Sequence, residues 1–215
     1  MDCKYKLHYF KLRGRGEPIR LMFAYRGVPF EDYQISLEEW PSKKSAYPNG
    51  QIPLLEVNGT KVAQSLAIYR YLAKQLNLNG KSDLETFQLD STAELFRDFI
   101  DQSLPYIQFL TGFRSGDKNQ LRNDHFLPAV EKFLPQIEKK LREAGSGWFG
   151  QSGLSFVDFY IAEANKDLWY RTIRTLNNVE GELLKKFPLI QRHNSDFYKL
   201  PELKDYLEKR GQLPF

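Results

Sequence analysis

Gly50-Gln51-Ile52-Pro53-Leu54-Leu55-Glu56-Val57, followed by Asn58-Gly59, is the stretch that decides the fold of this chain. Proline cannot donate to a strand ladder, so Pro53 is expected at the first residue of a strand or in a bend before it. A cis bond before Pro53 would place neighbouring backbone groups side by side at the sheet edge, where they could pair with an extended peptide. Asn-Gly is the strongest short hairpin signal, which predicts that residues 54–57 pair antiparallel with residues 60–63.

Ser65 follows this hairpin and opens a predicted helix over residues 65–72. The free backbone amides of a helix N-terminus, with a hydroxyl beside them, form a site for an anion. A peptide-pairing edge beside a carboxylate-binding helix end suits one kind of ligand, a small acidic peptide.

The N-terminal segment extends the same domain. Residues 5–9 alternate like a strand and lead to Arg13-Gly14-Arg15-Gly16-Glu17-Pro18, where a helix is expected to begin. Residues 28–35 are expected to form a second strand. The order β-α-β, then β-β-α around a proline turn, is typical of an α/β thioredoxin-like domain with a four-stranded mixed sheet.

The pattern changes near residue 77, from short strands and helices to helical periodicity almost throughout. Turn residues in 77–83 predict a linker between a thioredoxin-like domain (1–76) and an all-helical domain (84–215). Pro105 is expected to kink or break the first long helix near its middle. A loop over 111–119 precedes a second long helix, which Gly145-Ser146-Gly147 ends.

Ser155 and Asp158 have the form of a capping box, a hydroxyl at the N-cap and an acid three residues later. They predict a helix buried in the middle of the helical domain. No partner histidine for Asp158 is evident, because His8, His125 and His193 share no motif.

Composition excludes several classes of protein. With 41% hydrophobic and 14% aromatic residues the chain can bury a sizeable core. The single cysteine, Cys3, excludes an internal disulfide and fits a reducing compartment. The first residues lack the apolar run of a secretory signal, and no stretch approaches the ~20 apolar residues of a membrane span. We therefore expect a soluble, cytoplasmic protein.

The net charge of +4 raises the question of a nucleic-acid partner. The 31 basic residues are, however, scattered among 27 acidic ones, with short clusters only at 43–44, 139–140 and 185–186. Such clusters are typical of solvated surface charge. No reading helix or aromatic platform accompanies them, so nucleic-acid binding is not expected.

In order and at family-like spacing, several motifs resemble the cytosolic glutathione transferases, especially the sigma-like class and its nematode (nu-like) relatives. They are Tyr-Lys-Leu-x-Tyr-Phe (5–10), Arg-Gly-Arg-Gly-Glu (13–17), Trp40 with Lys44, Gly-Gln-Ile-Pro-Leu-Leu (50–55), Gln-Ser-Leu-Ala-Ile-x-Arg-Tyr-Leu (64–72) and Ser-Phe-Val-Asp-Phe (155–159). A thiol-disulfide exchange protein is excluded, since Leu12-Arg13-Gly14-Arg15 occupies the place of Cys-x-x-Cys.

The resemblance implies that the Tyr9 hydroxyl donates to the sulfur of glutathione, with Arg15 supporting the electrostatics of the sulfur site. The thiolate is the nucleophile, and a free thiol with a pKa of ~8.5 is mostly protonated at neutral pH. A hydrogen bond to a charged group contributes about 1.5–3 kcal/mol, enough to lower that pKa by one to two units at about 1.36 kcal/mol each. One well-placed hydroxyl is therefore sufficient to make the thiolate the major species near neutral pH.

The resemblance also implies the remaining contacts. The Trp40 indole and the Lys44 ammonium would bind the glycine end of glutathione, and Gln64 with Ser65 the γ-glutamyl carboxylate. Gln51 stands where relatives often carry lysine, a departure of little weight because the expected contact is through the backbone. The other implied residues are Gly50 and Ile52 at the peptide-pairing edge, Asp98 reaching the partner subunit's glutathione, and Ile100, Tyr106 and Tyr160 in the electrophile pocket.

The resemblance thus implies a homodimeric enzyme that conjugates glutathione to hydrophobic electrophiles in detoxification, with glutathione as co-substrate and no metal or cofactor. Three alternatives remain open. The first is a ligandin-type carrier of haem or other apolar anions, and the second is a glutathione-dependent prostaglandin isomerase or lipid peroxidase. The third, a non-catalytic interaction module, is disfavoured because five residues implied to bind glutathione are intact: Tyr9, Trp40, Lys44, Gln64 and Ser65.

Overall fold

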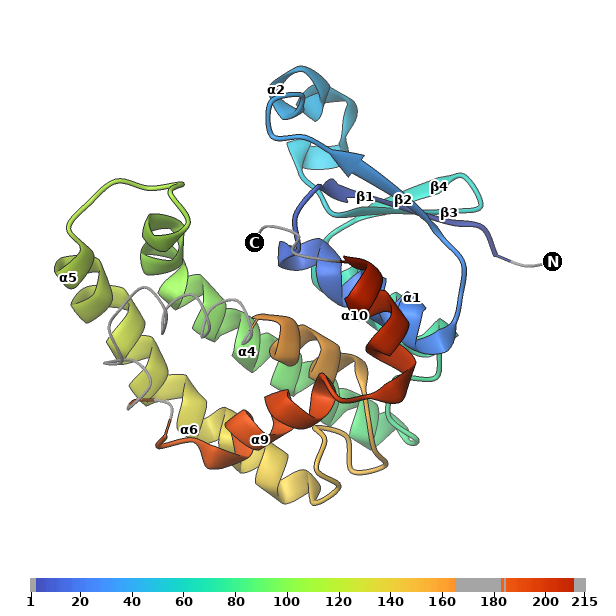
Figure 1. Cartoon of the computed structure of the whole chain (residues 1–215). Helices are drawn as coiled ribbons and strands as arrows, with labels where there is room; N and C mark the ends of the chain where they lie inside the picture. Colours follow the sequence, from blue (N-terminus) through green and yellow to red (C-terminus); the bar gives the residue numbers. More distant parts are fainter. Residues whose placement is uncertain (1–2, 165–182, 184, 211–215) are drawn as a thin grey trace. The chain divides into compact units, whose positions relative to one another are not determined.

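The structure is a computed structural model that describes residues 3–164, 183 and 185–210 (Figure 1). It divides into two compact units, one made of residues 3–78 with 198–210 and the other of residues 79–197 in their described parts. The predicted boundaries placed everything after residue 84 in the helical domain, and the structure differs for 198–210. These residues pack on the first unit because the side chains of Tyr206 and Arg210 bind a buried carboxylate there, that of Glu17.

A four-stranded mixed sheet forms the centre of the first unit, in the order β2-β1-β3-β4. The strands are β1 (Tyr5–Phe10), β2 (Glu31–Ile35), β3 (Leu54–Val57) and β4 (Thr60–Ala63). β1 runs parallel to β2 and antiparallel to β3, and β3 runs antiparallel to β4. The mixed sheet confirms the predicted thioredoxin-like fold.

The predicted hairpin is present. Val57 pairs with Thr60 across the turn, and Asn58 and Gly59 have φ values of 50° and 88°. Positive φ at both central residues gives a turn whose twist matches that of the strands, which is why Asn-Gly is favoured there. The Ile52–Pro53 peptide bond is cis, and Pro53 lies directly before β3.

Helices accompany the sheet of the first unit. These are α1 (Glu17–Arg26), α2 (Trp40–Lys43), α3 (Ser65–Gln75) and α10 (Lys204–Arg210), with 3₁₀ turns η1 (Gly14–Gly16), η2 (Lys44–Ala46), η3 (Pro48–Gly50) and η5 (Pro201–Leu203). The second strand begins at residue 31 rather than at the predicted 28. The Val28 N–H donates to Phe23 O, so this residue still closes the end of α1, and Pro29 has no N–H to offer a ladder.

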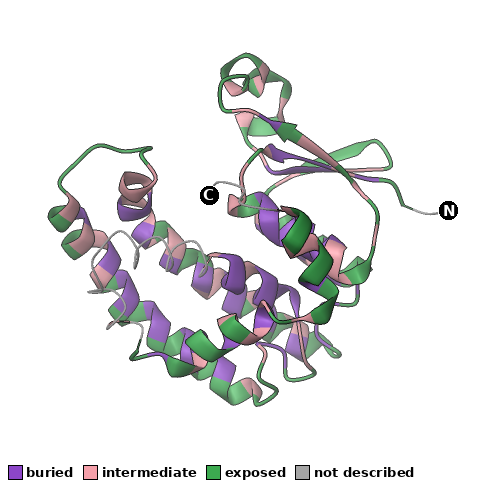
Figure 2. Ribbon diagram, viewed as in Figure 1, coloured by how far each residue is buried: buried purple, intermediate pink, exposed green. Residues whose placement is uncertain are grey.

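The second unit is helical, and its helices turn their buried faces toward one another (Figure 2). It contains α4 (Asp83–Leu110), α5 (Lys118–Leu121), the π-helical turn η4 (Arg122–Phe126), α6 (Leu127–Ala144), a helix over 156–164 and α9 (Pro188–Phe197). Gly145, with φ of 71°, ends α6 as predicted.

Pro105 does not break α4, which continues to Leu110. Only one short stretch of helix follows the proline, and the side chains of Tyr106 and Ile107 in that stretch are buried. Their packing offsets the lost backbone hydrogen bond. The loop after α4 is also shorter than predicted, because Asp117 Oδ1 accepts the Gln120 N–H at 2.7 Å and starts α5.

Candidate active site

One end of each of the four strands in the first unit lies along the same side of the sheet, which is called the sheet edge below. β1, β2 and β4 end at this edge and β3 begins there, since Phe10 pairs with Ile35, His8 with Leu54, and Leu54 with Ala63. The carboxyl ends of strands are where α/β sheets commonly bind ligands. All the residues expected to bind glutathione within one chain's first 65 residues lie here: Tyr9, Arg15, Trp40, Lys44, Gly50, Gln51, Ile52, Gln64 and Ser65.

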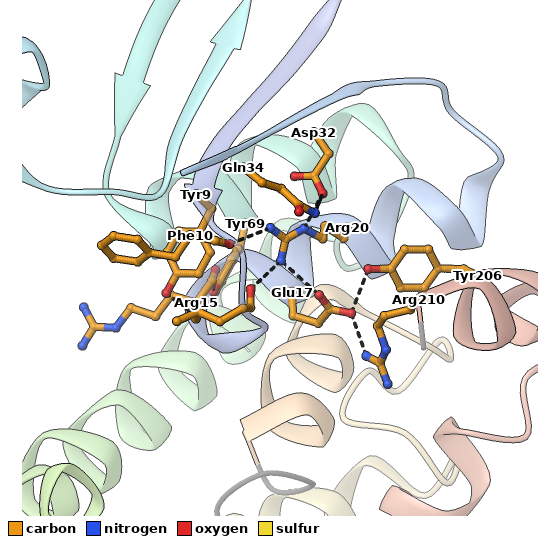
Figure 3. Close-up of polar contacts among 11 residues, drawn as sticks. Tyr9, Phe10, Arg15, Glu17, Arg20, Asp32, Gln34, Tyr69, Tyr206 and Arg210 are labelled. Carbon is orange, nitrogen blue, oxygen red and sulfur yellow. Dashed lines mark hydrogen bonds and ion pairs between the residues drawn. The ribbon is translucent and has the colours of Figure 1, made fainter. Parts of the chain in front are cut away.

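The Tyr9 side chain is 6% exposed, and its hydroxyl oxygen accepts the backbone N–H of Arg15 at 2.9 Å (Figure 3). Its own proton is not donated to any of the described residues. Burial raises the pKa of Tyr9, while the Arg15 N–H and the charges of Arg15 and Arg20 partly oppose that rise. Tyr9 is therefore a neutral hydroxyl at physiological pH, with one hydrogen to donate.

The loop after β1 is shaped around the Tyr9 ring. A Cβ atom on Gly16 would lie 2.3 Å from Tyr9 Cδ1, and one on Gly14 would lie 2.8 Å from Tyr9 Oη. Gly14 also has φ of +41°. Neither position accepts a side chain without moving the tyrosine, which explains the alternation Arg-Gly-Arg-Gly in the sequence.

Three elements clamp this loop. The Lys11 N–H donates to Ile35 O of β2 at 3.1 Å, and the Tyr69 hydroxyl of α3 donates to Arg15 O at 2.6 Å. From α1, Arg20 donates to the backbone carbonyls of the loop. Neither Tyr69 nor Arg20 is among the predicted site residues. Each reaches the loop from a helix, Tyr69 from the unspecified position of the 64–72 motif and Arg20 from beyond the 13–17 motif.

Trp40 lies in a cluster of aromatic side chains. Its ring centroid is 5.3 Å from that of Phe10 and 5.4 Å from that of Tyr47. The Tyr47 hydroxyl lies 3.0 Å from His8 Nδ1. Burial lowers the pKa of His8, so this contact is made by a neutral ring at pH 7. The cluster fixes the indole of the half-buried Trp40 at the sheet edge and adds Tyr47 as a residue that the sequence did not single out.

Lys44 is exposed and its aliphatic stem runs across Gly50, where a Cβ atom would lie 2.9 Å from Lys44 Cε. Gly50 also has φ of +57°. The glycine thus lets the lysine stem lie flat against the turn that precedes Gln51, with the ammonium free to bind a carboxylate.

Gln64 and Ser65 form the entry to α3. Gln64 has φ of 82° and ψ of 105°, a conformation that non-glycine residues rarely adopt and that occurs mostly at functional sites. Ser65 is the first residue of the helix, so neighbouring backbone N–H groups have no partner within it. A hydroxyl and helix-terminal amides thus lie where the anion site is expected, and the binding of a carboxylate there stays a prediction.

Four expected site residues lie in the second unit. Asp98 is exposed on α4, so its proposed role toward a partner subunit stays a prediction. Ile100 and Tyr160 are half-buried. Tyr106 is fully buried, with its ring 5.2 Å from that of Phe126. A residue that lines an open pocket keeps some accessible surface, so Tyr106 is a core residue here and the expectation for it is corrected.

The predicted capping box is present at the start of the 156–164 helix. The Ser155 N–H and hydroxyl both donate to Asp158 Oδ2, at 2.7 and 2.8 Å. The expectation that Asp158 has no histidine partner is wrong, because His193 Nε2 lies 2.8 Å from Asp158 Oδ1. The serine hydroxyl faces the acid rather than the imidazole, and all three residues are sealed from solvent. The arrangement is structural and not that of a hydrolase.

Within the described ranges, no group of three or more His, Cys, Asp or Glu side chains is arranged to hold a metal ion. None of the helices over that part of the chain combines the length and apolar character needed to cross a membrane.

Comparison with known proteins agrees with this geometry. Residues 5–74 match the glutathione S-transferase N-terminal domain family and residues 100–210 match the C-terminal domain family. A probable glutathione S-transferase 8 of Caenorhabditis elegans is 39% identical over 98% of both chains. Glutathione S-transferase 1 of Ascaris suum is 35% identical over 99% of both.

Solved structures extend the comparison. A Nu-class enzyme of Haemonchus contortus has a TM-score of 0.84 at 37% identity, covering 99% of this chain and 100% of that one. A monomeric glutathione S-transferase of the hookworm Necator americanus has a TM-score of 0.88 at 37% identity over the same shares. Prostaglandin synthase D of Nilaparvata lugens has a TM-score of 0.80 at 34% identity, covering 97% and 99%. With both domain families matched and full-length relatives above 30% identity, this chain belongs to the glutathione S-transferase family.

Proposed function

We propose that this protein conjugates the thiolate of glutathione to hydrophobic electrophiles, and that Tyr9 stabilises the thiolate. One observation carries the proposal: the Arg15 N–H occupies the acceptor side of the Tyr9 hydroxyl and leaves its proton to donate at the sheet edge. A hydrogen bond whose donor already accepts another is strengthened by polarisation. The raised pKa of Tyr9 supports a neutral donor rather than a tyrosinate base.

The reaction follows from these positions. Trp40 and Lys44 hold the glycine end of glutathione, the backbone beside Ile52 pairs with its peptide, and Ser65 with the α3 amides holds the γ-glutamyl carboxylate. The thiol proton passes to solvent. The thiolate sulfur then forms a bond to the electrophilic carbon, and the leaving group departs with its bonding electrons. No cofactor takes part in these reaction steps.

Turnover of an aryl halide with glutathione by the purified protein tests the proposal directly. The same preparation should be assayed with a prostaglandin endoperoxide and a lipid hydroperoxide, because the resemblance to a prostaglandin synthase supports isomerase activity as a second candidate. Haem titration tests the carrier alternative. Wild-type protein that does not bind glutathione in titration calorimetry would contradict every one of these enzymatic functions.

Ser65→Ala should weaken glutathione binding by about 1–3 kcal/mol, five- to over a hundredfold in Kd, because a carboxylate taken out of water loses a hydrogen-bond partner. Gln64→Ala should act in the same direction. Circular dichroism should not change. Thr60→Ala, which removes a hydroxyl at the other end of β4, is the matched control and should bind like wild type. Equal binding by Ser65→Ala and wild type would refute the carboxylate site.

We also propose a cytoplasmic homodimer in which Asp98 reaches the partner subunit's glutathione. Support comes from large apolar side chains left exposed within each unit, Val62 (46%) in the first and Leu84 (66%) and Phe87 (70%) in the second. The hookworm relative is described as monomeric, so the oligomeric state of this protein has to be measured.

Sedimentation velocity of the wild type should show a dimer at micromolar concentration. Asp98→Asn should weaken glutathione binding by about 0.5–1.5 kcal/mol without changing the sedimentation. A monomer at all concentrations would contradict both the dimer and the role of Asp98, and would leave the role of Tyr9 untouched.

A further inference from the structure

A buried set of charged groups joins the C-terminal helix α10 to the loop that holds Tyr9 (Figure 3). At its centre is Glu17, whose side chain is 0% exposed. Glu17 Oε1 accepts hydrogen bonds from the Tyr206 hydroxyl at 2.8 Å and from Arg210 Nη1 at 2.6 Å. Its other oxygen, Oε2, accepts from Arg20 Nη1 at 3.1 Å. Both carboxylate oxygens are thus fixed by directional contacts, one of them entirely by α10.

Arg20 carries the connection onward to the backbone. Its Nη2 donates to Phe10 O at 3.2 Å, its Nη1 to Leu12 O at 2.9 Å and its Nε to Asp32 Oδ2 at 3.0 Å. Phe10 is the residue after Tyr9, and Leu12 begins the loop that returns the Arg15 N–H to the Tyr9 oxygen. A rigid planar fork that binds both carbonyls fixes the path of this loop.

The charges of this set balance only when α10 is in place. Glu17 and Asp32 supply two negative charges, and Arg20 and Arg210 two positive ones. Burial alone would lower the pKa of Arg20, but the two carboxylates more than offset this and raise it. Without Arg210, Glu17 keeps its ion pair with Arg20, but the set carries one uncompensated negative charge, which favours a rearrangement of the groups around Glu17.

We propose that Tyr206 and Arg210 are positioning residues for the glutathione thiol, acting through Glu17 and Arg20 on the loop that orients the Tyr9 hydroxyl. The inference rests on the proposed role of Tyr9 and adds the C-terminal helix α10 to the elements that position its hydroxyl. The charged groups that act on Tyr9 are the exposed Arg15 and the buried Arg20, whose guanidinium carbon is 5.8 Å from the ring centroid. When Arg20 shifts, both the direction of the hydroxyl and the charge beside it change.

Tyr206→Phe tests the proposal with the smallest change, the loss of one hydroxyl. We expect kcat at about pH 6.5 to fall roughly 3- to 30-fold, the range typical of residues coupled to a site they do not touch. The pKa of the bound thiol, followed by thiolate absorbance, should rise. The loss of activity should therefore shrink as the pH rises. The KM for glutathione should stay within about twofold, since its predicted contacts lie on other elements.

Arg210→Met should give a larger effect of the same kind, and Arg210→Lys should restore part of the activity because it keeps the charge. Lys209→Met is the matched control: it removes one positive charge from the exposed face of the same helix and should leave activity unchanged. Should Arg210→Met not fold, Tyr206→Phe and Arg210→Lys still give the answer.

Two results for a folded Tyr206→Phe would overturn the inference. The first is a wild-type thiol pKa and pH profile. The second is a loss of activity that is the same at every pH, which is what a merely structural role produces. Tyr9→Phe, measured in parallel, distinguishes a failure of the positioning role from a failure of the proposed role of Tyr9. If only Tyr9→Phe raises the thiol pKa, the positioning role fails and the role of Tyr9 stands; if Tyr9→Phe leaves the thiol pKa unchanged, both fail.

Discussion

Replacing Tyr9 by phenylalanine is expected to lower kcat by roughly 10²–10³, the usual cost of removing one preorganised donor to a developing or resident anion. The ring stays, so its fit against Gly14 and Gly16 is preserved. The Arg15 N–H loses its acceptor, and the glutathione sulfur loses its donor. The pKa of the bound thiol should rise toward its free value of ~8.5, and glutathione affinity should change little, because the remaining contacts are intact.

Tyr5→Phe is the control for this experiment. Tyr5 lies on the same face of β1 as Tyr9 and is likewise buried, at 8% exposure, but it stands at the opposite end of the strand. Its loss of a hydroxyl should leave kcat within about twofold. If Tyr9→Phe retained full activity with an unchanged thiol pKa, another group would have to supply the donor.

The fold was predictable where a few adjacent residues determine the backbone. Asn58-Gly59 fixes a tight turn through its positive φ angles, and Pro53 fixes the start of a strand through its missing N–H. Ser155 and Asp158 satisfy each other within a single helical turn. Each of these signals is complete within a few residues, so a single sequence displays it in full.

Of the candidate site, the sequence predicted the residues that would contact glutathione but not the residues that hold Tyr9 in place. The resemblance assigns the residues that would touch glutathione, but the groups that hold Tyr9 come from distant positions. Tyr69 is 54 residues from its partner Arg15, and Tyr206 is 189 residues from Glu17. Such pairs have no spacing rule, because each depends on how whole elements pack. The assignment of 198–210 to the helical domain differs from the structure for the same reason.

The local sequence also does not show which individual side chains are buried. Tyr106 follows Pro105 on a long helix, and its position in the sequence does not tell which face of α4 is covered. The structure shows its ring packed on Phe126. His193 belongs to no motif either, yet it lies 35 residues from Asp158 in the chain and 2.8 Å from it in space.

Asp158→Ala is expected to lower the free energy of unfolding by about 3–5 kcal/mol, the cost of removing one partner of a buried polar pair. Asp158 is 0% exposed, and four groups contact its carboxylate. Oδ2 accepts from the N–H and the hydroxyl of Ser155, and Oδ1 accepts the Phe149 N–H at 2.9 Å and lies 2.8 Å from His193 Nε2. Alanine leaves buried polar groups without an acceptor, each of which costs about 1–3 kcal/mol.

The carboxylate also joins three separate parts of the unit: the turn at Phe149, the helix that Ser155 caps and α9 through His193. Its loss should therefore lower the melting temperature by about 6–20 °C, at 2–4 °C per kcal/mol for a protein of this size. Ser155→Ala removes one hydroxyl only and should cost about 1 kcal/mol. Asp101→Ala, an exposed acid on α4, should stay within about 0.5 kcal/mol of wild type. A melting temperature for Asp158→Ala no lower than that of Ser155→Ala would show that the capping hydroxyl, rather than the carboxylate that joins the three parts, holds this region together.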